Sequence, residues 1–186
     1  ESSEMCKDGS ILNQENASGN LNSYADDGFT AFDMADHYGS SEIIAGVFKN
    51  KYQLSEKINL FTKWVPVPGK ISKDSTREAL ERALIRMNQS QIDLMQFHAW
   101  HYQDSSWIDA LSYLKDLQEE GLVKNIGVTN FDTSHLRIAL SSGIPIVSNQ
   151  VCYSLLDRRA SFEMSELCKQ FNIKLFAFGT LAGGFL

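Results

Sequence analysis

Apolar and polar positions follow one another along this chain in a pattern that predicts strands and helices in turn. An apolar segment over residues 30–35 has the length of a buried strand, and residues 41–51 place apolar side chains on one helical face. The strand pattern recurs at five later segments, 58–64, 92–99, 123–129, 146–152 and 174–178. Helical patterns separate these strands, at 72–87, 107–120, 132–141 and 161–171.

Strict alternation of strands and helices is typical of a parallel sheet with right-handed crossovers. The strands are short and largely apolar, as expected where helices cover them. No glycine-rich turn of the form GxGxxG occurs, which argues against a doubly wound nucleotide-binding sheet. We therefore expect an α/β fold of the (β/α)8 TIM-barrel type, incomplete, with about six βα units present.

The first 20 residues differ from the rest of the chain. They are polar, with Ile11–Leu12 as an isolated apolar pair, and therefore have little apolar surface to bury. We expect an irregular N-terminal segment over 1–20 and a partial barrel domain over 21–186. Residues 21–28 are interpreted as the end of a helix that Gly28 stops.

Composition and charge exclude several classes of function. Of the 186 residues, 43% are hydrophobic and 22% are charged, which is typical of a globular protein. A formal net charge of −6 argues against nucleic-acid binding, and no apolar run approaches the roughly 18 residues of a membrane span. No signal peptide is recognisable, so we expect a cytoplasmic protein, or an organellar one if a transit peptide precedes Glu1. Three cysteines without metal-ligand spacing are interpreted as reduced thiols, Cys6, Cys152 and Cys168.

The expected strands end in side chains that can hydrogen-bond or stack. In chain order these residues are Asp33, Lys63, His98, Thr129–Asn130, Asn149–Gln150 and Phe178–Gly179. In a β/α barrel the carboxyl ends of the strands share one mouth, where catalysis takes place. The sequence therefore predicts an active site built from these positions.

Four of the residues near this mouth are suited to proton transfer. Tyrosine is a weak acid, with an ordinary pKa of about 10, and a nearby ammonium group favours its phenolate form. A carboxylate in turn holds the ammonium group charged and in place. We therefore expect Asp33, Lys63 and Tyr38 to form a proton-donating relay for a developing alkoxide, with His98 orienting the carbonyl. This chemistry is carbonyl reduction, and it requires a hydride source.

The sequence resembles the aldo-keto reductase family. The residues that carry the resemblance are Asp33–Gly39 in the pattern D-x-A-x-x-Y-G, Ser41–Glu42, Thr62–Lys63, Phe97–His98, the run 121–131, and Asn149–Val151. The resemblance implies a (β/α)8 barrel that reduces aldehydes or ketones with NADPH, or NADH as the alternative. Its tetrad falls on Asp33, Tyr38, Lys63 and His98, with Tyr38 as the general acid.

The resemblance also implies a cofactor site. Residues expected to bind the cofactor are Thr129, Asn130 and Gln150 at the nicotinamide carboxamide, Phe178 against the nicotinamide ring, and Gly179 and Leu181 in the pyrophosphate loop. Serine is more common in the family where Thr129 stands, and tyrosine or tryptophan where Phe178 stands. Both changes keep the hydroxyl or the aromatic face that binding requires.

Parts of the family pattern are missing. Neither the glycine-rich first strand nor the eighth strand with its basic phosphate-binding segment is found in the 186 residues. We interpret the sequence as truncated, with a further segment or a partner chain completing the barrel. We expect weak cofactor binding and little reductase activity from this chain alone.

Two other classes of function are weighed against the reductase. One is a non-catalytic cofactor-binding or scaffold subunit derived from the same fold. The other is a metal-dependent hydrolase that would use Asp33, Asp36, His37, His98 and His101, although no HxH pair occurs.

Three further groups of residues have open interpretations. The first group consists of aromatic side chains that follow the strands, and we expect them either to line a substrate pocket or to cover the barrel. They are Trp64, Trp100, His101 and Tyr102. Arg158–Arg159 bind an anion or lie in solvent, the second being favoured. The charged residues of 72–87, which include Arg77, Glu81 and Arg86, are expected to form an outward ion-paired face.

Overall fold

A computed structural model describes residues 4, 10–54, 56–67 and 71–186. The helices and strands alternate along the chain as the sequence predicts. Their bounds are α1 Gln14–Asp26, β1 Ala31–Asp33, α2 Ser41–Lys51, β2 Asn59–Trp64, α3 Lys73–Met87, β3 Leu94–His98, α4 Ser106–Glu119, β4 Ile126–Thr129, α5 Thr133–Ser141, β5 Ile146–Cys152, η1 Arg159–Ser161, α6 Glu163–Gln170, β6 Lys174–Phe178 and η2 Ala182–Gly184.

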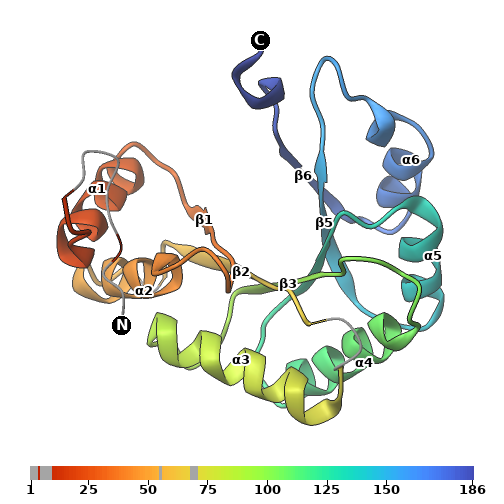
Figure 1. Ribbon diagram of the computed structural model, residues 1–186, viewed down its shortest axis with the longest axis horizontal. Helices are drawn as coiled ribbons and strands as arrows, with labels where there is room; N and C mark the ends of the chain where they lie inside the picture. Colours follow the sequence, from red (N-terminus) through yellow and green to blue (C-terminus); the bar gives the residue numbers. More distant parts are fainter. Residues whose placement is uncertain (1–3, 5–9, 55, 68–70) are drawn as a thin grey trace.

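The described residues contain one sheet of six parallel strands in the order β1-β2-β3-β4-β5-β6. A doubly wound sheet reverses its strand order at one point, and this sheet does not. The sheet curls around an open space, with α2 to α6 on its convex side (Figure 1). The prediction of an incomplete barrel is therefore confirmed as a curled half-barrel.

The hydrophobic core fills the layer between the convex face of the sheet and the helices. Its largest fully buried side chains include Phe48 of α2, Leu80 of α3, Phe97 of β3 and Leu114 of α4. Because the helices present one apolar stripe each, this single layer buries most of the large apolar side chains. The concave side is left for other residues.

Strand register decides which side chains face the concave side. Lys63, Gln96, Gly127 and Ser148 lie level with one another on neighbouring strands. The next row, two residues further along the strands, contains His98, Thr129, Gln150 and Phe176. Since parallel neighbours in register point to the same face, most of the predicted strand-end residues share one side of the sheet.

An aromatic pair spans the concave side. The rings of Phe61 and Phe176 stack with their centroids 5.8 Å apart and their planes 7° from parallel. These residues belong to β2 and β6, which are separated by three other strands. The contact therefore helps to keep the sheet curled.

Capping residues mark the starts of α3 and α5. Asp132 accepts a hydrogen bond from the His135 backbone N–H at 2.8 Å, and Ser72 and Ser75 form a reciprocal capping box. Gly28 follows the end of α1 with φ +94°, a conformation that favours glycine.

The expectation of an irregular segment over 1–20 is wrong for residues 14–20, which belong to α1. Asn13 caps this helix through the backbone N–H of Asn16, and α1 packs against α2, so tertiary contact stabilises a segment with few apolar residues. Residues 1–3 and 5–9 of that segment, and the thiol of Cys6, lie outside the described residues. Cys152 and Cys168 are free thiols, and burial raises the pKa of the Cys168 thiol to about 11.

Along the described stretches, no helix combines the length and the apolar character that crossing a membrane requires.

Candidate active site

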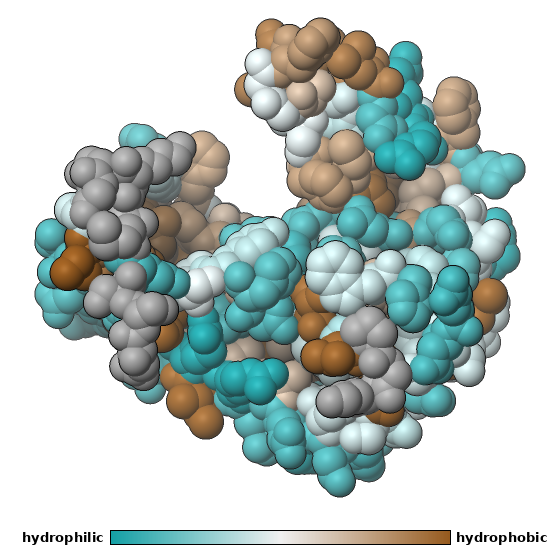
Figure 2. Space-filling model, viewed as in Figure 1, coloured by the Kyte–Doolittle hydropathy of each residue, from teal (hydrophilic) through white to brown (hydrophobic). Residues whose placement is uncertain are grey.

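The carboxyl ends of β1 and β2 bring Asp33 and Lys63 together. The Lys63 side chain is only 3% exposed, and its ammonium group donates hydrogen bonds to Asp33 Oδ2 and, at 2.9 Å, to the Met34 carbonyl. A buried ammonium group is costly unless it is paired, and these two acceptors provide the pairing. The molecule is hollowed between its α1–α2 side and the end of β6 (Figure 2).

Tyr38 lies beside this ion pair, on the turn between β1 and α2. The Lys63 ammonium nitrogen is 5.4 Å from the centroid of the Tyr38 ring, and Tyr38 is 51% exposed. The turn is closed by hydrogen bonds from the Tyr38 N–H to the Ala35 carbonyl and from the Ser41 N–H to the Tyr38 carbonyl, both 3.0 Å. The structure therefore places three of the four predicted catalytic residues next to one another.

Two glutamines also hold the Asp33 carboxylate. The side-chain amide of Gln96 donates to Asp33 Oδ1 at 2.7 Å, and that of Gln150 donates to Oδ2 at 3.2 Å. Sequence reasoning missed Gln96, because it lies inside an apolar strand. The available signal was its spacing: Gln96 is two residues before His98 and therefore faces the same side of β3.

His98, the fourth predicted catalytic residue, lies on the same face two strands away from Asp33. Its Nε2 atom is 3.4 Å from the Asn130 side-chain amide nitrogen, and its ring stacks on Trp100 with centroids 5.7 Å apart. Burial lowers the pKa of His98, and the nearby charges of His37 and Lys63 lower it further. A neutral imidazole can donate one hydrogen bond and accept another.

A nuclear magnetic resonance titration tests this environment. We expect His98 to titrate with a midpoint below the ordinary pKa of about 6.5, and Lys63→Met to raise that midpoint because it removes a nearby positive charge. The pKa of His98 is lower in the folded protein than in the unfolded chain, so the unfolded chain binds the proton at a higher pH. Protonation of His98 therefore lowers the free energy of unfolding as the pH falls below about 6.5. Lys49→Met, far from the mouth, should leave the midpoint unchanged, and a wild-type midpoint at or above 6.5 would contradict the assigned burial.

The residues expected at the nicotinamide carboxamide lie next to His98 at the ends of β4 and β5. Thr129 is buried, and among the described residues its hydroxyl oxygen has no hydrogen-bond partner. Asn130 adopts φ +58°, and its N–H donates to the Gln150 carbonyl at 2.8 Å. A hydroxyl and two side-chain amides fit an amide ligand, which needs both donors and acceptors, although Gln150 Nε2 here donates to Asp33.

The remaining predicted cofactor residues lie at the end of β6. Phe178 is partly exposed and pairs in register with Cys152, Gly179 follows with φ +64°, and Leu181 is exposed. A cavity of about 460 Å³ between the ends of β4, β5 and β6 is lined by Asn130 and Phe178. Two of the predicted cofactor residues therefore border one space of ligand size.

The aromatic residues after β2 and β3 divide between the two expected roles. Trp64 is buried against Phe97, with ring centroids 5.5 Å apart, and Tyr102 packs edge-on against Trp107 and Phe131. These two side chains cover the core. Trp100 is exposed beside His98, which places it at the mouth.

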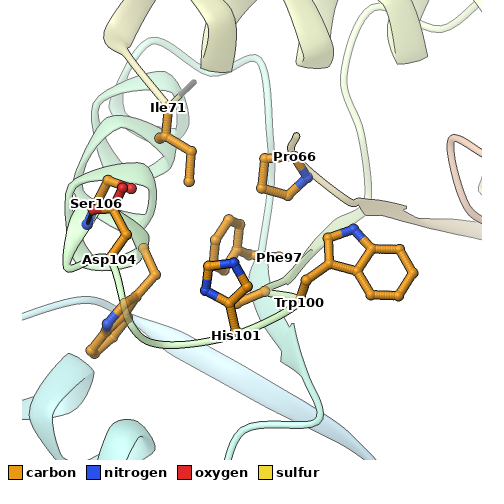
Figure 3. A pocket seen from close by; sticks show the side chains of 9 residues that line it. Pro66, Ile71, Phe97, Trp100, His101, Asp104 and Ser106 are labelled. Atoms are coloured by element: carbon orange, nitrogen blue, oxygen red, sulfur yellow. Dashed lines mark hydrogen bonds between the residues drawn. The ribbon is translucent and has the colours of Figure 1, made fainter. Parts of the chain in front are cut away.

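His101 and Trp100 border a separate small pocket between the loops that follow β2 and β3 (Figure 3). Pro66, Phe97 and Ile71 form its apolar walls. Its volume of about 20 Å³ accommodates a water molecule but not an organic substrate.

Of four further polar residues, two lie where they are expected and two do not. Asn149 faces the helices, where its buried amide donates to the Phe131 carbonyl at 3.0 Å. Arg159 forms a bidentate pair with Asp157, at 2.9 and 2.6 Å, in agreement with the favoured solvent-exposed interpretation. Arg86 departs from the expected outward ion-paired face, because it reaches Glu42, which is buried at the start of α2. Arg77, in contrast, pairs with Glu120 on the surface as expected.

The metal-hydrolase hypothesis requires a cluster of ligands. Within the described ranges, no group of three or more histidine, cysteine, aspartate or glutamate side chains is arranged to hold a metal ion. Asp36 and His37 instead bind each other at 3.0 Å, and Asp36 also accepts the Val65 N–H at 3.1 Å.

Comparison with known proteins identifies the family of the chain. The profile of the aldo/keto reductase family matches residues 7–186. The chain belongs to the aldo/keto reductase family. This confirms the resemblance that the strand-end motifs carry.

Among curated members of the aldo/keto reductase family, the chloroplastic pyridoxal reductase of Arabidopsis thaliana is 28% identical over 179 residues, covering 87% of this chain and 49% of the relative. An aldo-keto reductase of Mycobacterium sp. (strain KMS) is 30% identical over 162 residues, covering 86% and 56%. The chain thus spans about half the length of the curated reductases it matches.

Solved aldo-keto reductases share the fold of this chain. A thermostable aldo-keto reductase in complex with the inhibitor epalrestat superposes with a TM-score of 0.83 at 27% identity, covering 93% of this chain and 63% of that one. The aldo-keto reductase of Klebsiella pneumoniae in complex with NADPH gives 0.80 at 25% identity, covering 92% and 60%. The curled sheet of this chain therefore corresponds to part of a TIM barrel.

Proposed function

We propose that this site reduces the carbonyl group of a small aldehyde or ketone with NADPH, and that Tyr38 is the general acid. The observation that carries the proposal is the contact of Lys63 with both Asp33 and the Tyr38 ring. The family match and the NADPH complex of the Klebsiella relative support the class of reaction and the cofactor.

In this proposal the chain's own residues place and move one proton. Lys63 is held by Asp33 and by the Met34 carbonyl, so its charge stays beside the Tyr38 ring. That charge stabilises the phenolate which forms when Tyr38 gives its proton to the oxygen of the carbonyl. His98, neutral because burial lowers its pKa, hydrogen-bonds the same oxygen and orients it.

The cofactor would be held at the carboxyl ends of β4, β5 and β6. Thr129, Asn130 and Gln150 would bind the carboxamide, Phe178 would stack on the nicotinamide, and Gly179 and Leu181 would contact the pyrophosphate. When bound, the dihydronicotinamide supplies the hydride. Gln150 would then exchange its hydrogen bond to Asp33 for one to the carboxamide.

Tyr38→Phe is the direct test. We expect the rate of aldehyde reduction to fall by at least about 100-fold, because the ring stays while the acidic proton is lost. The assay uses 4-nitrobenzaldehyde, millimolar NADPH or NADH, and product detection by chromatography, so that even weak cofactor binding and slow turnover are measured.

Tyr24→Phe is the matched control, because Tyr24 is 56% exposed and lies on α1, away from the mouth. Its rate should equal that of the wild type. Cofactor binding, measured by nicotinamide fluorescence, without any Tyr38-dependent product would overturn the catalytic proposal and favour the non-catalytic cofactor-binding subunit.

A further inference from the structure

A buried carboxylate, that of Glu42, connects the segments that carry Lys63 and Tyr38. Glu42 belongs to the first turn of α2 and is 1% exposed. Its Oε1 atom accepts a hydrogen bond from the hydroxyl of Thr62 at 2.6 Å, and its Oε2 atom is 2.8 Å from Arg86 Nε. The guanidinium of Arg86 and the carboxylate of Glu42 thus form an ion pair. The two atoms do not form a hydrogen bond, because the N–H bond does not point toward the oxygen.

Each partner of Glu42 is next to a catalytic residue. Thr62 immediately precedes Lys63 on β2, and both are buried. Arg86 of α3 donates a second hydrogen bond, through Nη2, to the carbonyl of Gly39, which immediately follows Tyr38. One carboxylate therefore connects the strand that carries Lys63 with the turn that carries Tyr38.

The turn needs such a connection at its far end. Its near end is fixed to β2, since the Asp36 N–H donates to the Lys63 carbonyl at 3.0 Å and Asp36 accepts the Val65 N–H. Tyr38 itself is half exposed, and Gly39, with φ +53°, lies in the left-handed region that glycine adopts without strain. The contact from Arg86 adds a link at the far end, beside the hydrogen bonds from the Thr62 hydroxyl to Glu42 and from the Ser40 hydroxyl to Glu4.

We propose that Glu42, acting through Thr62 and Arg86, is a positioning residue that sets the placement of the Tyr38 hydroxyl relative to the Lys63 ammonium group. The inference rests on the proposed function of Tyr38 and names the part of the fold that holds it. Stability alone does not account for the arrangement, because a buried ion pair contributes little net stability over apolar packing.

Glu42→Gln tests the proposal, because glutamine keeps the shape and an acceptor for Thr62 but loses the charge that holds Arg86. At saturating NADPH we expect kcat for aldehyde reduction to fall by about 10-fold with little change in KM, since misplaced reacting groups slow the chemical step. Hydrogen exchange of the Tyr38 and Ser41 amides should become faster, while the amides of β5 should exchange as in the wild type. The exchange experiment needs no cofactor.

Matched variants separate positioning from loss of folding. Thr62→Val removes the hydroxyl with little change in shape and should act like Glu42→Gln, and Thr62→Ser should restore both readouts. Arg86→Lys keeps the charge but cannot reach two acceptors with a rigid fork, so it should also loosen the turn. Glu81→Gln, which removes an exposed partner of Arg77, is the control without effect.

Two results would overturn the proposal. The first is that the Tyr38 and Ser41 amides of Glu42→Gln and Thr62→Val exchange hydrogen at the wild-type rate. The second is that amides throughout the sheet exchange faster than in the wild type by the same factor, while kcat per folded molecule is unchanged. Failure of the proposed function gives a different result. In that case no protein, wild type included, shows Tyr38-dependent reduction, while hydrogen exchange still decides whether Glu42 holds the turn.

Discussion

Lys63→Met should abolish most of the reductase activity while leaving the protein folded. The substitution keeps an unbranched side chain of similar length but removes the charge beside Tyr38, so we expect the rate per folded molecule to fall by at least about 100-fold. Asp33 keeps the amides of Gln96 and Gln150 as donors, and it is 37% exposed to solvent, so it is not left without partners. The measurements are product formation with millimolar NADPH and urea unfolding.

Lys49→Met is a closely matched control. Lys49 is also a buried lysine paired with an aspartate, at 2.9 Å from Asp93, with 6% of its side chain exposed. Asp93 also accepts the Leu60 N–H at 2.8 Å, so this pair joins α2 to the sheet far from the mouth. We expect Lys49→Met to cost about 3–5 kcal/mol of unfolding free energy and to leave the rate per folded molecule unchanged. Equal loss of activity in both variants would contradict a catalytic role of Lys63.

Gly46→Ala should destabilise the protein strongly, because α2 and α3 touch through their backbones at this residue. A Cβ atom on Gly46 would lie 2.1 Å from the carbonyl oxygen of Met87 and 2.5 Å from its carbonyl carbon. Backbone atoms cannot rotate away, so the helices must separate, and we expect a cost of about 3 kcal/mol. Urea unfolding measures this change.

Gly19→Ala is the same substitution in a helix where space is available. A Cβ atom on Gly19 would lie 3.6 Å from the Tyr52 hydroxyl, an ordinary contact. Alanine should therefore stabilise α1 by about 0.5–1 kcal/mol, since glycine costs helices that much. If both substitutions changed the free energy of unfolding in the same direction, the result would contradict the close approach of α2 and α3.

The fold could be predicted from the sequence because its signals are local. The strands at 146–152 and 174–178 and the helix at 41–51 have the predicted bounds, since apolar patterns define them. The helix that begins at Gln14 could not be predicted, because its stability comes from packing on α2 and its own sequence is polar.

The candidate site was predictable where residues occupy strand ends, as Asp33 and Lys63 do. Residues that act across the sheet were not. Gln96 looks like a stray polar residue in an apolar strand, and Arg86 has the spacing of an exposed helical charge. Their partners lie 63 and 44 or more positions away in sequence, and only the curl of the sheet and the contact of α2 with α3 bring them close.

The order of the strands has a consequence for how the protein folds. Each strand pairs with the next one along the chain, so strand–helix units can dock one after another as the chain leaves the ribosome. The hydrogen bond from Gln150 to Asp33 joins residues 117 positions apart, and the Phe61–Phe176 stack also spans most of the sheet. Such contacts have a high loop-closure cost and form late. The side chains of the candidate site are therefore brought to their final geometry only after most of the sheet exists, so a protein that stalls during synthesis would be structured but would lack the assembled site.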